Sequence, residues 1–214
     1  TPEGVDFPQY KLFGQDVIKS VSGNANKSYT IYRADGSTVS NGSATAEDWK
    51  VLLDDDPNTY VLIPDWDSGV DYENFRGPIV ELNERRTLDT IRISPSQTAS
   101  VHMNTVRIRY RDENGEMKTI GTKFFNRTDK QNRRYYEAVF ESPITTDYLE
   151  VRTSTRYGAS QNYTLCELKL YDYDDLEAKV EALFADVSHS RLNEDVTEES
   201  IQALIDRVNT LDPE

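Results

Sequence analysis

The sequence predicts a mainly β protein, in which an antiparallel β-sandwich is followed by a C-terminal α-helical hairpin. Short alternating runs recur between turn signals up to residue 171. One example is residues 105–111, where Val106, Ile108 and Tyr110 alternate with arginines. A period of two is typical of half-buried strands. After Tyr171 the apolar residues fall at helical spacing, so the β region is expected to end there.

We divide the chain into a sandwich of residues 1–172 and a helical hairpin or linker of residues 173–214, which could belong to a larger bundle. Residues 1–45 form an N-terminal extension, and the sequence leaves open whether it adds strands to the sandwich. The second helix of the hairpin is expected to begin at about Glu198, with Thr197 as its N-cap. We expect its apolar stripe to pack on the sandwich or on a third helix; the stripe is Ile201, Leu204, Ile205, Val208 and Leu211.

The alternation also predicts the individual strands and the loops between them. The expected strands are residues 16–22, 28–34, 37–40, 59–63, 79–82, 88–94, 105–111, 117–121, 135–140, 147–154 and 163–171. The Asp35-Gly36 pair is typical of a tight hairpin turn between the second and third of these. The longer expected loops are residues 64–78, 95–103, 123–134 and 155–162, and they contain most of the candidate ligand residues.

An acidic turn lies at residues 53–60, where Asp54, Asp55 and Asp56 are followed by Pro, Asn and Thr. Calcium takes about six to eight oxygen ligands from carboxylates, hydroxyls and backbone carbonyls. A tight acidic turn offers all three kinds within a few residues. A solvated turn with Asx-type hydrogen bonds uses the same residue types. On the residues alone, both interpretations stay open.

Charge and cysteine content exclude several classes of protein. The net charge is −14, and residues 172–214 carry 13 acids against 3 bases. Nucleic acids and anionic membranes are therefore disfavoured as partners, since both are bound largely through Lys and Arg. No apolar run is long enough to span a bilayer. The single cysteine, Cys166, excludes an internal disulfide and is expected to be a buried small hydrophobe, while two histidines are too few for a zinc site.

The acidic turn and four later segments resemble F5/8 type C (discoidin-like) domains. Residues 53–60 resemble the family's DGdpnTxW turn, with Asp55 where Gly is usual and Val61 where Trp is usual. Further family motifs resemble residues 78–83 with 90–93, 106–110, 148–152 and 165–171, in the same order, with Glu81 and Asn83 as departures. The resemblance covers about residues 45–172 and indicates a divergent member, similar to bacterial family 32 carbohydrate-binding modules.

The resemblance implies a galactose-binding-like jelly-roll β-sandwich and a structural calcium. Carried over, Asp56, Thr59 and Glu167 would be side-chain ligands, and the backbone carbonyls around Leu53, Asp54 and Cys166 would complete the site. One point follows from physics as well. Glu167 interrupts an apolar strand, and a buried carboxylate is costly unless it is paired or bound to a metal.

The resemblance also implies that a ligand binds on loops at one end of the sandwich, although the fold alone gives no specificity. Sugars offer an apolar face to an aromatic ring and hydroxyls to polar side chains. The candidate ligand residues are Trp66, Tyr72, Arg76, His102, Asn126, Arg127, Arg156, Tyr157 and Asn162. Alternatively, Trp66 and Phe75 plug the end of the sandwich and His102 is an ordinary exposed loop residue.

These observations favour a noncatalytic carbohydrate-binding module of a secreted or cell-surface bacterial protein. Its expected partners are glycans of galactose or amino-sugar type and other domains of the same parent chain. The chain starts with Thr and has no basic and apolar leader, so we expect any signal peptide to be absent from it. A protein-interaction, adhesion or spacer module on the same fold is the alternative. A glycosidase needs two suitably spaced carboxylates, and no such cleft motif is evident.

Overall fold

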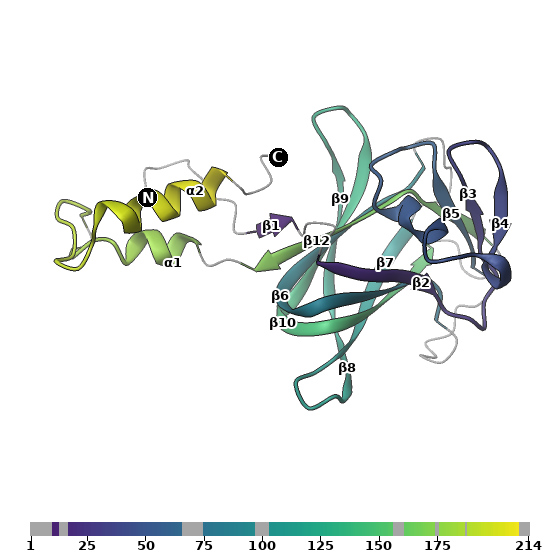
Figure 1. The fold of residues 1–214 in the computed structure, drawn as a ribbon, viewed down its shortest axis with the longest axis horizontal. Coiled ribbons are helices and arrows are strands. Elements are labelled where there is room, and N and C mark those ends of the chain that lie inside the picture. The colour runs from purple at the N-terminus through teal and green to yellow at the C-terminus, as the bar shows by residue number, and fades with distance from the viewer. Residues whose placement is uncertain are drawn as a thin grey trace.

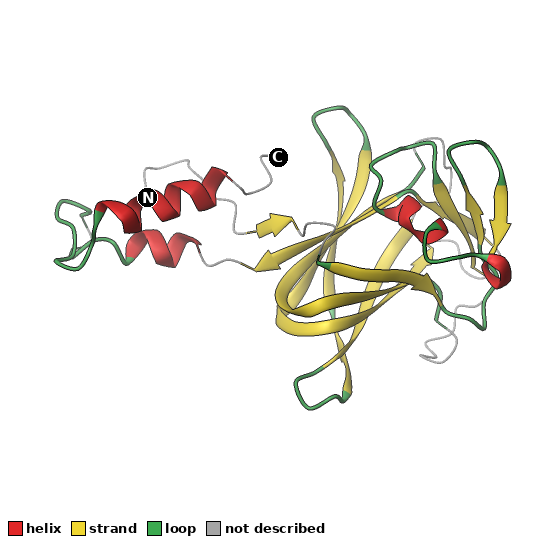
Figure 2. Ribbon diagram, viewed as in Figure 1, coloured by secondary structure: helices red, strands yellow, loops and turns green. Residues whose placement is uncertain are grey.

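The structure is a computed structural model that describes residues 10–12, 17–65, 75–96, 103–155, 161–173, 176–186 and 188–209. Two antiparallel sheets form a β-sandwich, and two helices extend from it (Figure 1). Figure 2 shows that strands make up most of the molecule. The predicted fold class, a mainly β sandwich followed by a C-terminal helical hairpin, is confirmed.

The larger sheet has eight strands in the order β1-β12-β6-β10-β7-β8, with β2 paired to β6 and β9 paired to β10. Their bounds are β1 (Tyr10–Leu12), β2 (Ile18–Gly23), β6 (Pro78–Ser94), β7 (Met103–Arg111), β8 (Met117–Ile120), β9 (Thr122–Thr128), β10 (Arg134–Thr155) and β12 (Glu167–Tyr173). The smaller sheet has the order β11-β5-β3-β4, with β3 (Thr30–Tyr32), β4 (Thr38–Ser40), β5 (Tyr60–Asp65) and β11 (Gln161–Leu165).

The N-terminal extension belongs to the sandwich, which answers the question that the sequence left open. Its strands join both sheets, because β1 and β2 pair with β12 and β6, and β3 pairs with β5. The predicted turn at Asp35-Gly36 is present between β3 and β4. Gly36 has a φ of 80°, a backbone conformation that glycine adopts without steric cost.

Two expected loops are strands in the structure. Residues 83–87 continue β6, and Arg86 and Thr87 pair with Thr146 and Thr145 of β10, so the four strands expected at 79–82, 88–94, 135–140 and 147–154 are two long ones. The expected loop at 123–134 is also wrong, because β9 pairs with β10 from Thr122 to Thr128. Most side chains in these stretches are polar, so a search for apolar residues passes over them, although Phe124 packs against the core.

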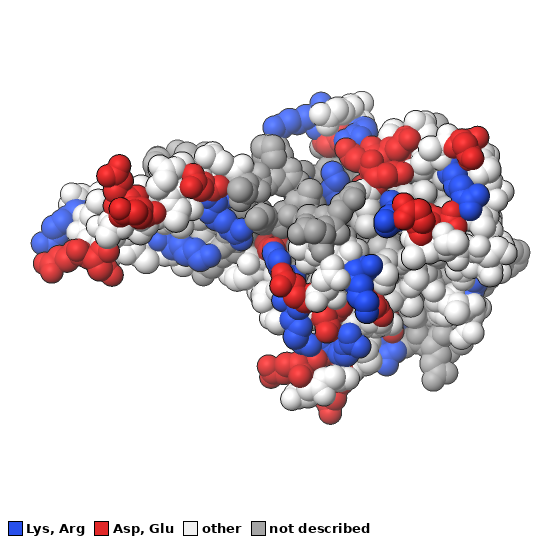
Figure 3. Space-filling model, viewed as in Figure 1, with Lys and Arg blue, Asp and Glu red and all other residues white. Residues whose placement is uncertain are grey.

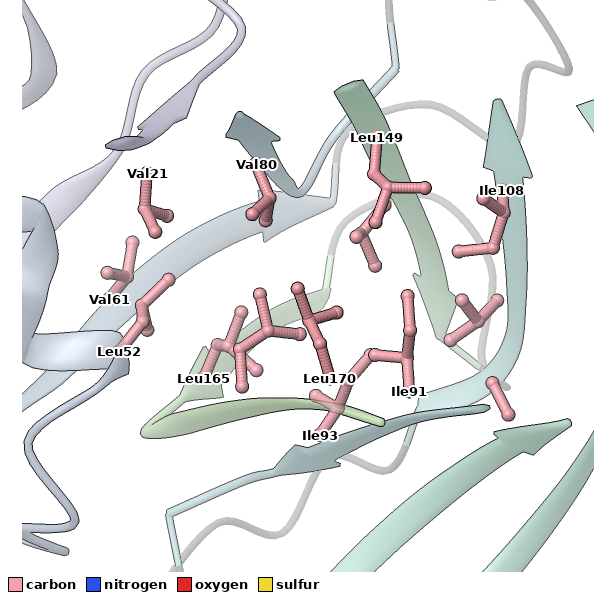
Figure 4. Close-up of a cluster of buried hydrophobic side chains, with 14 of the residues drawn as sticks. Val21, Leu52, Val61, Val80, Ile91, Ile93, Ile108, Leu149, Leu165 and Leu170 are labelled. Carbon is pink, nitrogen blue, oxygen red and sulfur yellow. The ribbon is translucent and has the colours of Figure 1, made fainter. Parts of the chain in front are cut away.

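The core lies between the two sheets and receives apolar side chains from almost every strand (Figure 4). Leu170, Ile91 and Ile93 reach it from the larger sheet, and Val61 and Leu165 from the smaller one. A fully buried Leu or Ile contributes about 2 kcal/mol through its removal from water. Two short 3₁₀ helices, η1 (Asn41–Ser43) and η2 (Asp48–Leu52), precede β5, and η2 places Trp49 and Leu52 in the same core.

The C-terminal hairpin consists of α1 (Leu176–Glu181) and α2 (Glu198–Asn209). Thr197 caps α2 as predicted, because its hydroxyl accepts a hydrogen bond from the Ser200 backbone N–H at 3.2 Å. The described part of the stripe does not pack on the sandwich: Ile205 and Val208 are 47% and 37% exposed, and the helices point away from the sheets (Figure 1). Leu211 lies outside the described residues. A third helix as the stripe's partner stays a prediction. In the described part of the chain, neither helix is suited in length and apolar content to cross a membrane.

Gly77, at the start of β6, provides a test of the fold. Its φ is 128°, and a Cβ atom there would lie 1.9 Å from the carbonyl oxygen of Val151. We expect Gly77→Ala to lower the free energy of unfolding by roughly 3 kcal/mol or more, since backbone strain and a steric clash add. Gly36→Ala is the matched control: its φ is 80° and it has no neighbour within 4 Å. Strain alone should cost it about 1 kcal/mol. Equal losses in urea unfolding would contradict the close approach of β6 to β10.

Candidate functional site

The acidic turn is held in place by η2, which precedes it. The Asp48 carboxylate accepts hydrogen bonds from the Arg33 Nε at 2.6 Å and the Thr45 backbone N–H at 2.8 Å. The Arg33 guanidinium is the main reason that the pKa of Asp48 is lowered to about 2, and the Thr45 N–H adds to the effect. Buried Trp49 and Leu52 fix the other side of η2, so the turn starts from a rigid base.

The backbone of the acidic turn has a positive φ at Asp55. Asp55 has a φ of 57°, and it occupies the position where the family has glycine. Side chains cap the neighbouring amides: Asp54 accepts a hydrogen bond from the Asp56 N–H, and Asp56 accepts two from Asn58, all within 2.9 Å. These are Asx-type bonds, so the solvated-turn interpretation describes part of the segment correctly.

Several oxygen atoms crowd around the hydroxyl of Thr59. The Asp54 carboxylate oxygens lie 2.8 and 3.0 Å from Thr59 Oγ1, the Asp56 carbonyl oxygen 3.1 Å and the Val51 carbonyl oxygen 3.5 Å. The hydroxyl carries one proton and can satisfy one of these acceptors fully. A cluster with more oxygens than protons suits a hard cation such as calcium.

Glu167 closes the other side of the turn. Its side chain is buried and accepts the Asp55 backbone N–H at 2.8 Å. Burial raises the pKa of this carboxyl to about 8. Lys169, two residues on, pairs with Asp55 at 3.6 Å, and among the described residues no cation lies within ion-pair distance of Glu167. The neighbouring Cys166 is buried, as predicted, and burial raises the pKa of its thiol to about 12.

The residues around the turn fit calcium, with one difference from the resemblance. The Asp54 side chain, and not that of Asp56, lies beside Thr59, while Asp56 contributes its carbonyl oxygen. The described residues contain no group of three His, Cys, Asp or Glu side chains arranged for a metal. A cation here would therefore depend on the Thr59 hydroxyl and backbone carbonyls as well as on carboxylates. Calcium stays a prediction.

The second candidate region is the end of the sandwich where three loops are anchored. Five predicted ligand residues, Trp66, Tyr72, His102, Arg156 and Tyr157, lie outside the described residues. The strand ends that flank them are described and are joined in pairs. Asp65 pairs with Gln161 and Met103 with Thr155 in the sheets.

Backbone amides join the remaining loop anchors. The Thr153 N–H donates to the Arg76 carbonyl at 3.0 Å, and the Ser96 N–H donates to Thr164 Oγ1 at 3.0 Å. Hydrogen bonds therefore join the described ends of the three loops to one another. These ends flank the five predicted ligand residues in sequence.

The other predicted ligand residues divide into two groups. Arg76 and Asn162 belong to the loop anchors, Arg76 buried and Asn162 exposed, and Phe75 beside them is buried. Asn126 and Arg127 lie instead on β9, where Arg127 pairs with Glu137 at 3.2 Å. Sequence reasoning missed Arg92 and Tyr135, which sit near Glu137 on the outer face of the larger sheet. The alternation could place them on the solvent side, but their grouping depends on the register of β6 with β10.

Comparison with known proteins identifies similar solved structures. The family 32 modules CBM32-1 and CBM32-2 of ZmpB from Clostridium perfringens, solved with GalNAc, match 95% of this chain and 47% of theirs, at 19% identity and a TM-score of 0.48. An F5/8 type C domain from Bacteroides fragilis matches 78% of this chain and 98% of its own, at 17% identity and a TM-score of 0.48. Both matches are to domains of the kind that the sequence resembles.

This chain spans 19% to 47% of the length of the ZmpB chains that it matches. No protein-family model matches the sequence. No curated protein matches it either.

The Arg33–Asp48 pair makes stability depend on pH in the acid range. The pKa of Asp48 is about 2 in the folded chain against 3.8 without its partners. The ionised carboxylate therefore stabilises the fold fully above about pH 4, and this contribution is lost as the pH falls through 2. We expect Asp48→Asn to lower the melting temperature at neutral pH and to flatten its decline between pH 4 and 2. A variant whose decline parallels that of the wild type would contradict the assignment.

Proposed function

We propose that the chain is a noncatalytic carbohydrate-binding module that binds galactose-type or amino-sugar glycans through its end loops. The observation that carries the proposal is the pairing of the loop anchors, Asp65 with Gln161 and Met103 with Thr155. Trp66, His102 and Arg156 directly adjoin three of these paired residues in sequence, Asp65, Met103 and Thr155. An aromatic ring, an imidazole and a guanidinium are the groups that can stack on a sugar and bond its hydroxyls.

The acidic turn supports a structural role over catalysis. Glycosidases hold one acid ready to give a proton and a second carboxylate across the bond to be cleaved. Here Asp54 and Asp56 accept hydrogen bonds from the turn itself, and Glu167 is buried against the Asp55 amide. These carboxylates therefore stabilise the backbone conformation of the acidic turn, which is a structural role.

We propose further that calcium is the structural cofactor of this turn. The oxygens around Thr59 and the buried Glu167 carboxylate support it, because a divalent cation would offset the cost of placing these groups together. Asp54, Thr59 and Glu167 would hold the ion through side chains, with the Asp56 carbonyl beside them.

The hairpin of α1 and α2 supports a modular setting. Ile205 and Val208 keep much of their apolar surface exposed on a helix that extends from the sandwich, and apolar helix stripes normally pack against a partner. We propose that other domains of a secreted or cell-surface bacterial protein are that partner. A protein-interaction or spacer module without sugar binding is the alternative, and the sugar titration below separates the two.

Substitutions in the end loops test sugar binding. We expect methyl β-galactoside or methyl N-acetyl-β-galactosaminide to bind the wild type in calorimetric titration. Trp66→Ala and His102→Ala should each weaken binding by roughly tenfold or more, as is usual when a central aromatic or hydrogen-bonding group is removed. Phe125→Ala is the matched control, since Phe125 is an exposed aromatic residue on β9, away from the loop anchors. Loss of binding in the control alone would refute the end-loop site.

Calcium is tested through stability. We expect calcium at about 100 times its dissociation constant to stabilise the wild type by about 2.7 kcal/mol relative to chelator. The melting temperature should therefore rise by several degrees. Glu167→Gln and Asp54→Asn should abolish the rise. Asp35→Asn, at an exposed turn between β3 and β4, should keep it. Identical melting curves of the wild type with calcium and with chelator would rule the cation out.

A further inference from the structure

A pocket opens on the outer face of the larger sheet, beside the acidic turn. Its volume is about 460 Å³, within the range of roughly 300 to 1,000 Å³ that ligand sites occupy. One wall is the turn between β9 and β10, with Asp129, Arg133 and Tyr135. The opposite wall is the acidic turn, and Arg92 and Lys169 lie between the walls.

The sheet register places the pocket on the solvent side of the sandwich. Lys169 of β12 lies opposite Arg92 of β6, while their neighbours Leu168 and Ile93 point into the core. Arg92 is itself held rigidly, because Nε donates to Glu137 at 3.0 Å and NH1 donates to the Tyr171 hydroxyl at 2.9 Å. Its guanidinium lies 4.5 Å from the centre of the Tyr171 ring and 5.2 Å from that of Tyr135, so the floor of the pocket is preorganised.

Opposite charges lie side by side in this pocket. Among the described residues, five Lys or Arg and four Asp or Glu line it, so groups of both signs are present. Lys169 lies 3.6 Å from Asp55, and Arg133 lies 2.8 Å from Asp129. In Figure 3, basic side chains gather at the tip of the β9–β10 hairpin and acidic ones on the neighbouring turn. A lining of both signs, in which Asp55 and Asp129 already pair with bases, offers less attraction to an ion than a pocket built from one sign of charge.

Adjacent donors and acceptors match a different kind of ligand. A hydroxyl group both donates and accepts hydrogen bonds, so neighbouring hydroxyls on a ring can each meet a cation and a carboxylate. The Tyr135 ring, half-buried in the wall, offers an apolar surface for the C–H face of such a ring. An uncharged sugar unit has both features, hydroxyls at its edge and an apolar face.

We propose that this pocket is a second saccharide site, specific for an uncharged sugar ring and separate from the end loops. The second site rests on the proposed function for the expectation that sugars are the ligands. The contacts that support it lie on the outer face of the larger sheet. In this site Tyr135 stacks on the ring, and the Asp55–Lys169 and Asp129–Arg133 pairs bond its hydroxyls. Two sites on separate faces would let one module bridge two points of a glycan, and avidity would then strengthen weak single contacts.

Asp55→Gly is the sharpest variant. It removes a pocket carboxylate at a residue whose φ is 57°, where glycine is less strained, and it keeps the amide that binds Glu167. Asn132→Gly is the matched control: Asn132 has a φ of 60° in the β9–β10 turn but does not line the pocket. Tyr135→Ala tests the stacking ring, and Phe125→Ala, on the neighbouring strand, is its control.

The experiment is a titration of the full chain, with calcium present, followed by amide NMR. The probes are methyl β-galactoside, methyl N-acetyl-β-galactosaminide and methyl α-mannoside as neutral sugars, with glucuronic acid and glucosamine as charged ones. We expect a neutral sugar to shift the amides of Gln131, Tyr135 and Lys169 saturably. Asp55→Gly and Tyr135→Ala should weaken this binding roughly tenfold, while both controls and Trp66→Ala leave it unchanged.

Three results would overturn the second site. They are pocket amides that no neutral sugar shifts, shifts that persist unweakened in both Asp55→Gly and Tyr135→Ala, and a response to the charged sugars alone. Shifts confined to the end loops would refute the pocket while supporting the proposed function. If the pocket amides shift in both the wild type and Trp66→Ala while the end loops do not respond, the pocket is supported and binding through the end loops is refuted.

Discussion

The antiparallel pairing of β6 with β10 is the constraint on which the rest of the sandwich depends. Both strands are long, and the pairing shifts register between Val139 and Ile144 and again between Thr146 and Tyr148. Such irregularities bend strands and increase their twist. Each strand can therefore serve different partners along its length: β6 pairs with β2 in its first part and β12 in its second, and β10 pairs with β9 and then with β7.

The same pairing positions both candidate regions. The C-terminal end of β10 leads into the loop that returns through β11, so the loop anchors meet where β10 meets β7. At the other part of the strand, Tyr135 and Glu137 face outward beside Arg92, which builds the floor of the outer pocket. The hydrogen bond from the Asp55 amide to Glu167 then connects the turn before β5 to the start of β12, and thus one sheet to the other. Rigid strands carrying variable loops and faces are a common way to support binding.

The sequence was a good guide wherever one face of an element was apolar. The alternation of β7, the Thr197 cap and the burial of Cys166 followed from local patterns, and the positive φ of Asp55 agrees with the resemblance. It failed at residues 83–87, where Arg86 and Thr87 pair with the distant Thr146 and Thr145 of β10, and at residues 122–128, which form a hairpin with the start of β10 although most of their side chains are polar. Long-range register has no local signal of its own. For the same reason the outer pocket could not be foreseen: its two walls lie about 75 to 80 residues apart in sequence, and only the fold brings them together.

Sugar binding is the central claim, and a glycan array probed with the full chain in the presence of calcium tests it most directly. The account predicts binding to glycans that end in a galactose-type or amino sugar, and weaker binding after chelation, because the proposed calcium ion would stabilise the acidic turn. Silence across the array from protein that is shown to be folded would contradict the account. The module would then be a spacer or a protein-binding domain built on the same sandwich.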